Sequence, residues 1–179
     1  MNKLKKIFLT LERALLSIKY VINEKWYIKA NEKYLKHMGV RINHPKFIAR
    51  DVKIDLTDPS KITIGKNTVI TSKVTLLVHD YSIECGLVAI GKQDPAYESL
   101  FIRPIVIGDN CFIGQQTFIK PGTIIGNNCI IGAGSVVNGT IPDDSVVIGN
   151  PCRVVCKTSE WATKKYVEHN YVRGSKRRK

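Results

Sequence analysis

Between residues 107 and 142 an aliphatic residue returns at every sixth position. The six hexads read IGDNCF, IGQQTF, IKPGTI, IGNNCI, IGAGSV and VNGTIP, and each opens with Ile or Val. The fifth position is small in five hexads, and glycine follows the opening residue in four. A period of six does not fit an α-helix, because steps of 3.6 residues per turn would spread these positions over three sides. The same frame occurs upstream in IGKNTV and ITSKVT, residues 64 to 75.

Each hexad predicts one short strand followed by a turn, and three hexads predict one triangular coil. The opening aliphatic side chain and the small fifth side chain point inward and stack from coil to coil. Gly and Asn in the turns accept backbone angles that β-branched residues avoid. We therefore predict an all-β core, a parallel β-helix of hexapeptide repeats, over residues 41–158.

Residues 1–40 follow a helical period instead and predict an amphipathic N-terminal segment. Apolar residues recur there at steps of three and four, with the basic residues largely off this stripe: Leu4, Ile7, Phe8, Leu11, Leu15, Ile18 and Ile22. Two interpretations are open. The pattern favours a helix that packs on the main domain, and the alternative is docking on an anionic membrane surface.

The hexad frame breaks after His79 and resumes only near Ile105. If the intervening residues stayed within the coil, they would place Lys92, Asp94 and Glu98 in the apolar core. We therefore predict that residues 79–104 project from the β-helix as a loop.

The formal net charge is +13, from 28 Lys and Arg against 15 Asp and Glu. This excess predicts an acidic partner, such as a phosphate-rich ligand, an anionic membrane or nucleic acid. Nucleic acid is not favoured, since the sequence has no recognition helix, zinc finger or aromatic-basic RNA motif. Residues 159–179 leave the repeat and predict a C-terminal helix with a basic tail, most often a solvated end.

Five cysteines without metal-ligand spacing argue against both a disulfide framework and a metal site. They favour a reducing compartment. The apolar N-terminal residues are interrupted by Glu12, Arg13 and Lys19, and no small-residue cleavage site follows, so neither a signal peptide nor a spanning helix is predicted. We expect a cytoplasmic protein, with peripheral contact at the inner face of the membrane as an open alternative.

Residues 107–155 resemble the bacterial hexapeptide-repeat acyltransferases, in the branch of galactoside, maltose and polysaccharide O-acetyltransferases. The resemblance covers roughly residues 45–158, and its most diagnostic piece is the ending SVVIGNPCRVV. It implies a left-handed parallel β-helix, acetyl-CoA as the acyl donor with no metal required, and a homotrimer with active sites between neighbouring β-helices. Apolar sixth positions also favour oligomerisation: Phe112, Phe118, Ile124 and Ile130.

Relatives of this kind carry a long loop at the same place with an active-site histidine at its start, which His79 matches. Moving an acetyl group from a thioester to a hydroxyl or amine needs a base, and a neutral imidazole can take the proton. Asp80 and Glu84 are candidates to orient the ring, and a backbone carbonyl is an equal alternative. The competing interpretation is that His79 is an ordinary polar loop residue.

The developing oxyanion needs a hydrogen-bond donor, for which the backbone N–H groups of Gly114 and Gln115 are candidates. The resemblance places acetyl-CoA against Gln115, Ala133 and Arg153. Where the family often has Thr-Lys, this chain has Asn138-Gly139, so that contact is expected to be weaker or supplied elsewhere.

The acceptor is expected to contact the loop and polar residues of the early coils, namely Asp51, Asp58 and Thr71. The predicted function is acetyl-CoA-dependent O-acetylation of a sugar hydroxyl in a glycan or its precursor. N-acetylation of an amino sugar or another amine would use the same base and cofactor and stays open. The alternative of a different class is a non-catalytic β-helix scaffold.

Overall fold

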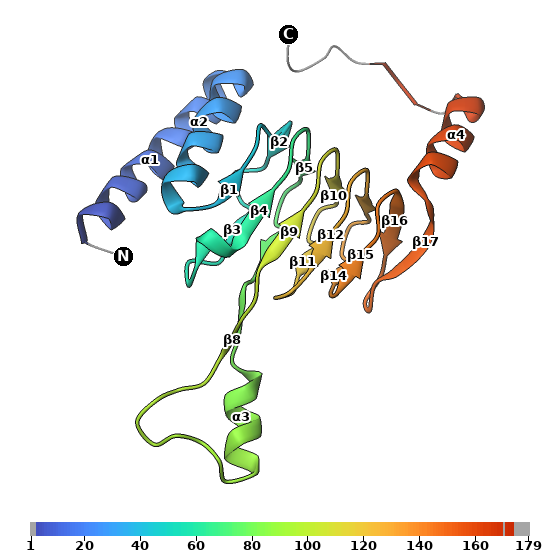
Figure 1. The fold of residues 1–179 in the computed structure, drawn as a ribbon. Helices are drawn as coiled ribbons and strands as arrows, with labels where there is room; N and C mark the ends of the chain where they lie inside the picture. Colours follow the sequence, from blue (N-terminus) through green and yellow to red (C-terminus); the bar gives the residue numbers. More distant parts are fainter. Residues whose placement is uncertain (1–2, 170, 174–179) are drawn as a thin grey trace.

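The computed structural model of the chain describes residues 3–169 and 171–173. Its centre is a parallel β-helix, with two helices at one end and a single helix at the other (Figure 1). An arm projects sideways from the β-helix and carries one further helix (Figure 1). Within the described part of the chain, no helix is long and apolar enough to cross a membrane.

Three sheets form the faces of the β-helix, and we call them sheets A, B and C. Sheet A contains β1 (Arg41–Ile42), β4 (Ile62–Ile64), β9 (Ile105–Ile107), β12 (Ile124–Ile125) and β15 (Thr140–Ile141). Sheet B contains β2 (Phe47–Ile48), β5 (Val69–Ile70), β10 (Phe112–Ile113), β13 (Ile130–Ile131), β16 (Ser145–Ile148) and β17 (Arg153–Lys157). Sheet C contains β3 (Lys53–Ile54), β6 (Thr75–Leu76), β11 (Phe118–Ile119) and β14 (Val136–Val137). Neighbouring strands are parallel, except that β17 pairs antiparallel with β16 at the end of sheet B.

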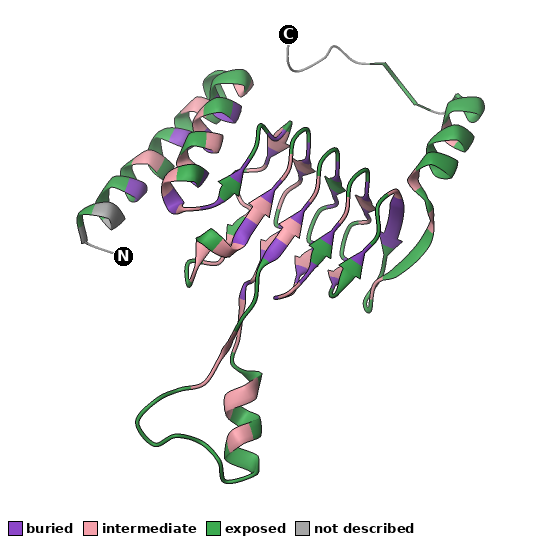
Figure 2. Cartoon of the chain, viewed as in Figure 1, coloured by how far each residue is buried: buried purple, intermediate pink, exposed green. Residues whose placement is uncertain are grey.

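The core consists of three columns of aliphatic side chains, one behind each sheet. In sheet B, for example, Ile113 lies in register with Ile70 on one side and Ile131 on the other, and all three are fully buried. The opening residues of all six hexads are at most 1% exposed (Figure 2): Ile107, Ile113, Ile119, Ile125, Ile131 and Val137. The parallel β-helix predicted from the period of six is confirmed.

The turns between strands depend on the fourth hexad position. This position adopts a left-handed backbone conformation in seven of the eight hexads identified in the sequence: Asn67, Lys73, Asn110, Gln116, Gly122, Asn128 and Gly134. Asn and Gly tolerate this conformation better than β-branched residues do. The frame therefore places a sharp corner after every short strand.

The N-terminal segment is a helical hairpin of α1 (Lys3–Ile22) and α2 (Glu24–Met38). The Asn23 side chain accepts hydrogen bonds from two backbone N–H groups and caps the start of α2, and Gly39 ends α2 at a φ of 110°. The Tyr27 hydroxyl and the Asn31 side chain both donate to the Ile48 carbonyl, at 2.7 and 3.1 Å. Helix α2 therefore covers the first coil of the β-helix.

The apolar stripe predicted for the N-terminal helix does not pack on the domain. Leu9 and Leu16 are the buried apolar side chains of α1, and they lie on the opposite side of the helix from the stripe. The stripe itself is exposed along most of α1 (Figure 2). The side chains of Lys3, Lys5 and Lys6 lie outside the described residues.

The segment predicted as a loop forms a two-stranded arm. β7 (His79–Asp80) pairs antiparallel with β8 (Phe101–Ile102), and α3 (Ser82–Ala89) lies at the far end of the arm (Figure 1). A short 3₁₀ turn, η1 (Pro59–Lys61), precedes β4, and α4 (Thr158–Glu168) follows β17. Residue 170 and residues 174–179 of the predicted basic tail lie outside the described residues.

We predict that Ile119→Ala lowers the free energy of unfolding by about 2–5 kcal/mol, because it opens a cavity in a dry column that relaxes only partly. Ile124→Ala is the matched control, since Ile124 is 45% exposed and Ile119 fully buried. The Ile124→Ala substitution should lower the free energy of unfolding by no more than about 0.5 kcal/mol. Urea denaturation of both variants measures the difference, and equal losses would contradict the inward column.

Candidate active site

The predicted site residues sit at two corners of the β-helix. The corner between sheets C and A, the C–A edge, carries residues 55–61, His79, the root of the arm and Asn138-Gly139. The corner between sheets B and C, the B–C edge, carries residues 49–52, 71–74, 114–117 and 132–135. Each edge runs along the β-helix from coil to coil, so residues far apart in sequence stack along it.

His79 lies at the root of the arm on the C–A edge, and its ring is held by Asp55. The Asp55 Oδ2 atom is 2.6 Å from His79 Nδ1, and the Thr57 Oγ1 atom is 3.0 Å from the same nitrogen. The Asp55 side chain is 4% exposed, whereas that of His79 is 26% exposed. Tyr81 contacts the ring edge to face, with centroids 5.6 Å apart.

Hydrogen bonds keep the buried Asp55 carboxylate ionised. Its Oδ2 atom accepts the N–H groups of Val78 at 2.8 Å and His79 at 3.2 Å, and its Oδ1 atom accepts that of Thr57 at 2.9 Å. Burial by itself would raise the pKa of Asp55, but the hydrogen bonds from Thr57, Val78 and the His79 ring hold this pKa below its usual value. An acceptor-only carboxylate facing Nδ1 assigns the ring proton to that nitrogen. Nε2, which then carries the free lone pair, is the basic nitrogen of the His79 ring.

Asp80 and Glu84 do not orient the ring, which corrects the sequence-based candidates. Asp80 Oδ1 accepts the Ser82 N–H at 2.8 Å at the start of α3, and Glu84 Oε2 accepts the Ser99 N–H at 2.7 Å within the arm. Successive side chains of an extended strand point opposite ways, so Asp80 faces away from its neighbour's ring. Both carboxylates shape the arm.

Asp55 and Thr57 were missed from the sequence, although a signal was present. Ile42, Ile48 and Ile54 are also spaced by six residues. Ile54 pairs with Leu76 in sheet C, so the residue after Ile54 meets the chain just past Leu76. Extending the hexad frame upstream would have placed Asp55 beneath the start of the arm.

The candidates for acetyl-CoA are divided between the two edges. Gly114, Gln115 and Ala133 stack on the B–C edge, where a Cβ on Gly114 would come within 2.5 Å of the Ala133 nitrogen. The Gly114 N–H donates to the Ile131 carbonyl at 2.8 Å, so it is not a free donor for an oxyanion. Among the described residues the Gln115 N–H has no partner. Exposed Arg153 lies in β17, beyond the same edge, whereas Asn138-Gly139 lies on the C–A edge.

The candidates for the acceptor are divided in the same way. Asp51 and Thr71 lie on the B–C edge, where Asp51 accepts from the Ser72 hydroxyl and the Thr71 hydroxyl donates to the Ile113 carbonyl. Asp58 lies on the C–A edge and caps η1 through the Ser60 N–H.

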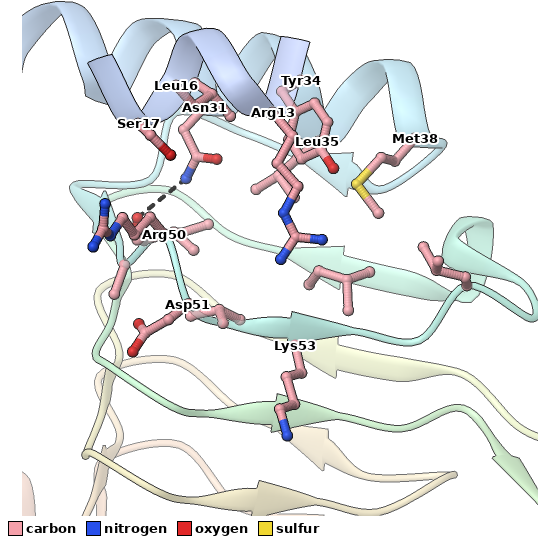
Figure 3. Close-up of a pocket in the computed structure, with 15 residues that line it drawn as sticks. Arg13, Leu16, Ser17, Asn31, Tyr34, Leu35, Met38, Arg50, Asp51 and Lys53 are labelled. Carbon is pink, nitrogen blue, oxygen red and sulfur yellow. Dashed lines mark hydrogen bonds between the residues drawn. The ribbon is translucent and has the colours of Figure 1, made fainter. Parts of the chain in front are cut away.

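Asp51 also lines a cavity of about 400 Å³ between the helical hairpin and the first coil (Figure 3). Three cationic side chains line it too, Arg13, Arg50 and Lys53. The cavity wall includes Ile54 and Leu56, the two neighbours of Asp55 in sequence. Asp51 is thus the acceptor candidate that lies beside a cavity.

The site residues of one chain therefore do not converge. His79 and Asp55 form one group on the C–A edge, and Gln115, Ala133 and Thr71 form the other on the B–C edge, with sheet C between the two edges. The apolar sixth positions are likewise spread over three faces: Phe112 and Ile130 on sheet B, Phe118 on sheet C and Ile124 on sheet A. Successive hexads occupy successive faces, so only every third one shares a face.

Comparison with known proteins identifies the repeat. A family model described as bacterial transferase hexapeptide, with six repeats, matches residues 104–139. Protein CapG of Staphylococcus aureus is 33% identical over 135 residues, which covers 75% of this chain and 75% of CapG. The crystal structure of a maltose O-acetyltransferase from Clostridium difficile 630 is 25% identical, with a TM-score of 0.58 and coverage of 87% of this chain and 89% of that chain.

A galactoside acetyltransferase in complex with coenzyme A has a TM-score of 0.52 at 24% identity and covers 98% of this chain and 90% of that chain, a likeness that shows the fold. These neighbours confirm the predicted fold class, a left-handed parallel β-helix with N-terminal helices. The chain spans 66%, 54% and 54% of three other curated relatives that are 32 to 34% identical to it, among them the galactoside O-acetyltransferase of Escherichia coli (strain K12).

We predict that the stabilisation contributed by Asp55 is lost in acid. Its folded pKa lies below the unfolded value, so the contribution is complete above about pH 5 and falls as pH drops through the ordinary aspartate pKa of about 3.9 and below. The stability difference between wild type and Asp55→Asn should therefore shrink between about pH 5 and about pH 3 in urea denaturation. Asp94→Asn, at an exposed position in the arm, is the control. A difference independent of pH would contradict an Asp55 carboxylate that is stabilised in its ionised form by the fold.

Proposed function

The chain belongs to the bacterial hexapeptide-repeat transferases, and from that premise we propose that it moves an acetyl group from acetyl-CoA to a sugar hydroxyl of a glycan or glycan precursor. The Asp55–His79 pair carries this proposal, because the carboxylate contacts Nδ1 of the ring and leaves Nε2 directed away from it. The maltose O-acetyltransferase and the coenzyme A complex of the galactoside enzyme support the acceptor class and the donor.

In the proposed reaction, Nε2 of His79 takes the proton of the acceptor hydroxyl while the hydroxyl oxygen attacks the thioester carbonyl carbon. The imidazolium that forms is stabilised by the ionised Asp55 at 2.6 Å from Nδ1. The tetrahedral intermediate then collapses, the carbon–sulfur bond breaks, and the thiolate of CoA takes the proton back from Nε2. His79 leaves the cycle neutral, and Asp55 acts as a positioning residue that does not touch the substrate.

We propose further that the active site is assembled between copies of the chain in a homotrimer. The base lies on the C–A edge, and the free Gln115 N–H, a donor for the thioester oxyanion, lies on the B–C edge. Sheet C separates these edges within one copy. Placing the C–A edge of one copy against the B–C edge of the next would bring His79 and the Gln115 N–H together. The Arg153 guanidinium would then lie beside the phosphates of CoA.

We also propose peripheral contact between the basic N-terminal segment and an anionic membrane surface, which would place the protein at the inner face of the membrane. The first 40 residues hold nine basic and three acidic side chains, a net charge of +6. An anionic leaflet attracts such a segment within a Debye length of its surface.

We predict that His79→Ala lowers kcat by about 10²–10⁴-fold, the usual contribution of a positioned base, and leaves coenzyme A binding nearly intact. Release of free thiol from acetyl-CoA, with maltose and a galactoside as acceptors, measures turnover. A thermal shift with coenzyme A measures binding. Asp55→Asn should cost less than His79→Ala, because it disturbs the orientation of the base but keeps the base itself.

Asp80→Asn and Glu84→Gln are the matched carboxylate controls, since their hydrogen bonds go to the arm and not to the ring. Both should retain turnover close to wild type. Wild-type turnover of His79→Ala, or a larger loss in Asp80→Asn than in Asp55→Asn, would rule out the proposed base and its partner.

We predict that sedimentation equilibrium gives three times the chain mass of 20.1 kDa. Mixed trimers of His79→Ala and Arg153→Ala chains test whether sites are shared. A site between copies receives His79 from one chain and Arg153 from the next, so every mixed trimer holds one site with both wild-type residues. These mixtures should bind acetyl-CoA and turn over better than either variant alone. A stable monomer at micromolar concentration would contradict the shared site.

A further inference from the structure

Helix α1 turns its larger apolar face away from the protein. Eight aliphatic and aromatic side chains on this face are between 48% and 80% exposed (Figure 2): Leu4, Ile7, Phe8, Leu11, Leu15, Ile18, Val21 and Ile22. At 100° per residue they fall within an arc of about 140° of the helix circumference. A globular helix normally buries such an arc, and here the arc is uncovered.

Cationic side chains lie on the adjacent helix. Helix α2 exposes Lys25, Lys29, Lys33 and Lys36, which at steps of four and three form one stripe along its outer side. Trp26, at the turn of the hairpin, is 61% exposed. An apolar arc, a row of lysines and an exposed tryptophan are the features of a helix that lies in a membrane interface.

We infer that the exposed face of α1 inserts into the interfacial region of a bilayer containing anionic lipids, with the lysine stripe of α2 facing the headgroups. This deepens the proposed membrane contact by naming its surface, and it does not depend on the acetyl transfer. Six of the 20 residues of α1 are charged, so the helix lies along the bilayer and does not cross it.

The charge of the hairpin favours a membrane over a second copy of the chain as the occupant. A two-fold pairing through α1 would place two segments of net charge +6 against each other. An anionic lipid surface instead complements both the apolar arc of α1 and the exposed lysines of α2. The hairpin covers one end of the β-helix, so a flat bilayer reaches α1 without contacting the three sheets (Figure 1).

The test is flotation of the full chain with vesicles of phosphatidylcholine alone or mixed with phosphatidylglycerol. We expect binding to the mixed vesicles, weakening as salt rises from about 0.1 M to about 0.5 M. In a Trp161→Phe background, binding should shift the Trp26 emission to shorter wavelength. Leu11→Glu/Leu15→Glu, at positions 61% and 53% exposed, should lower the affinity roughly tenfold or more.

Val167→Glu/Val172→Glu is the matched control, because it makes the same change in charge at exposed aliphatic positions near the C-terminus. This control should bind like wild type. The inference is overturned if the wild type ignores the anionic vesicles, or if the α1 variant binds as tightly as the control. It is also overturned if the α1 variant changes the sedimenting mass, which would assign the face to a second copy.

Acetyl transfer to a soluble sugar should be unchanged in the Leu11→Glu/Leu15→Glu variant, because neither side chain lies near His79 or Gln115. Acetyl transfer by a wild-type chain that does not bind vesicles would therefore contradict the membrane inference and leave the proposed enzyme intact. Vesicle binding without any transfer would instead count against the proposed enzyme.

Discussion

The stacking of aliphatic side chains at every sixth residue is the interaction on which the rest of the molecule depends. Each column is dry and in register, as Ile70, Ile113 and Ile131 are in sheet B. A shift of one residue would turn charged or polar side chains into the core and leave the corner positions without their required backbone conformation. The columns therefore fix which corner each intervening residue occupies. The Asp55–His79 pair and Gln115 stand at such corners, so the columns also fix where these candidate site residues lie.

The candidate site lies where the hexad frame of the sequence is interrupted, although the columns continue in register on either side of the arm. When the chain leaves sheet C after Leu76, the N–H groups of Val78 and His79 have no next strand of a coil to pair with, and a buried unpaired N–H is costly. The Oδ2 atom of Asp55 accepts hydrogen bonds from both N–H groups and from Nδ1 of the His79 ring. The same carboxylate thus lies at the start of the arm and holds the His79 ring, which ties the position of His79 to the coil of Asp55 and not to the rest of the arm.

The repeat made the core, the corners and the position of His79 predictable, because a period of six has one physical solution and its interruption is visible in the sequence. Asp55 was not predicted, since its hydrogen bond to His79 spans 24 residues and becomes visible only when the hexad frame is extended upstream to Ile54. Asp80 was named instead on proximity in sequence, which strand geometry makes a poor guide. The amphipathic pattern of α1 was correct, but a pattern shows that an apolar face exists and not what covers it.

The flat sheet C also keeps His79 and Gln115 apart within one chain. The three flat sheets of the β-helix hold its edges apart. No change within a single copy can therefore bring the Gln115 N–H to the ring of His79 without breaking the columns that define sheet C. In the proposed homotrimer, a second β-helix alongside the first would supply the missing edge. Contacts between copies would then use the sides of the β-helix, whereas α1 lies at its end (Figure 1). The proposed assembly and the proposed membrane contact would therefore use separate surfaces of the chain.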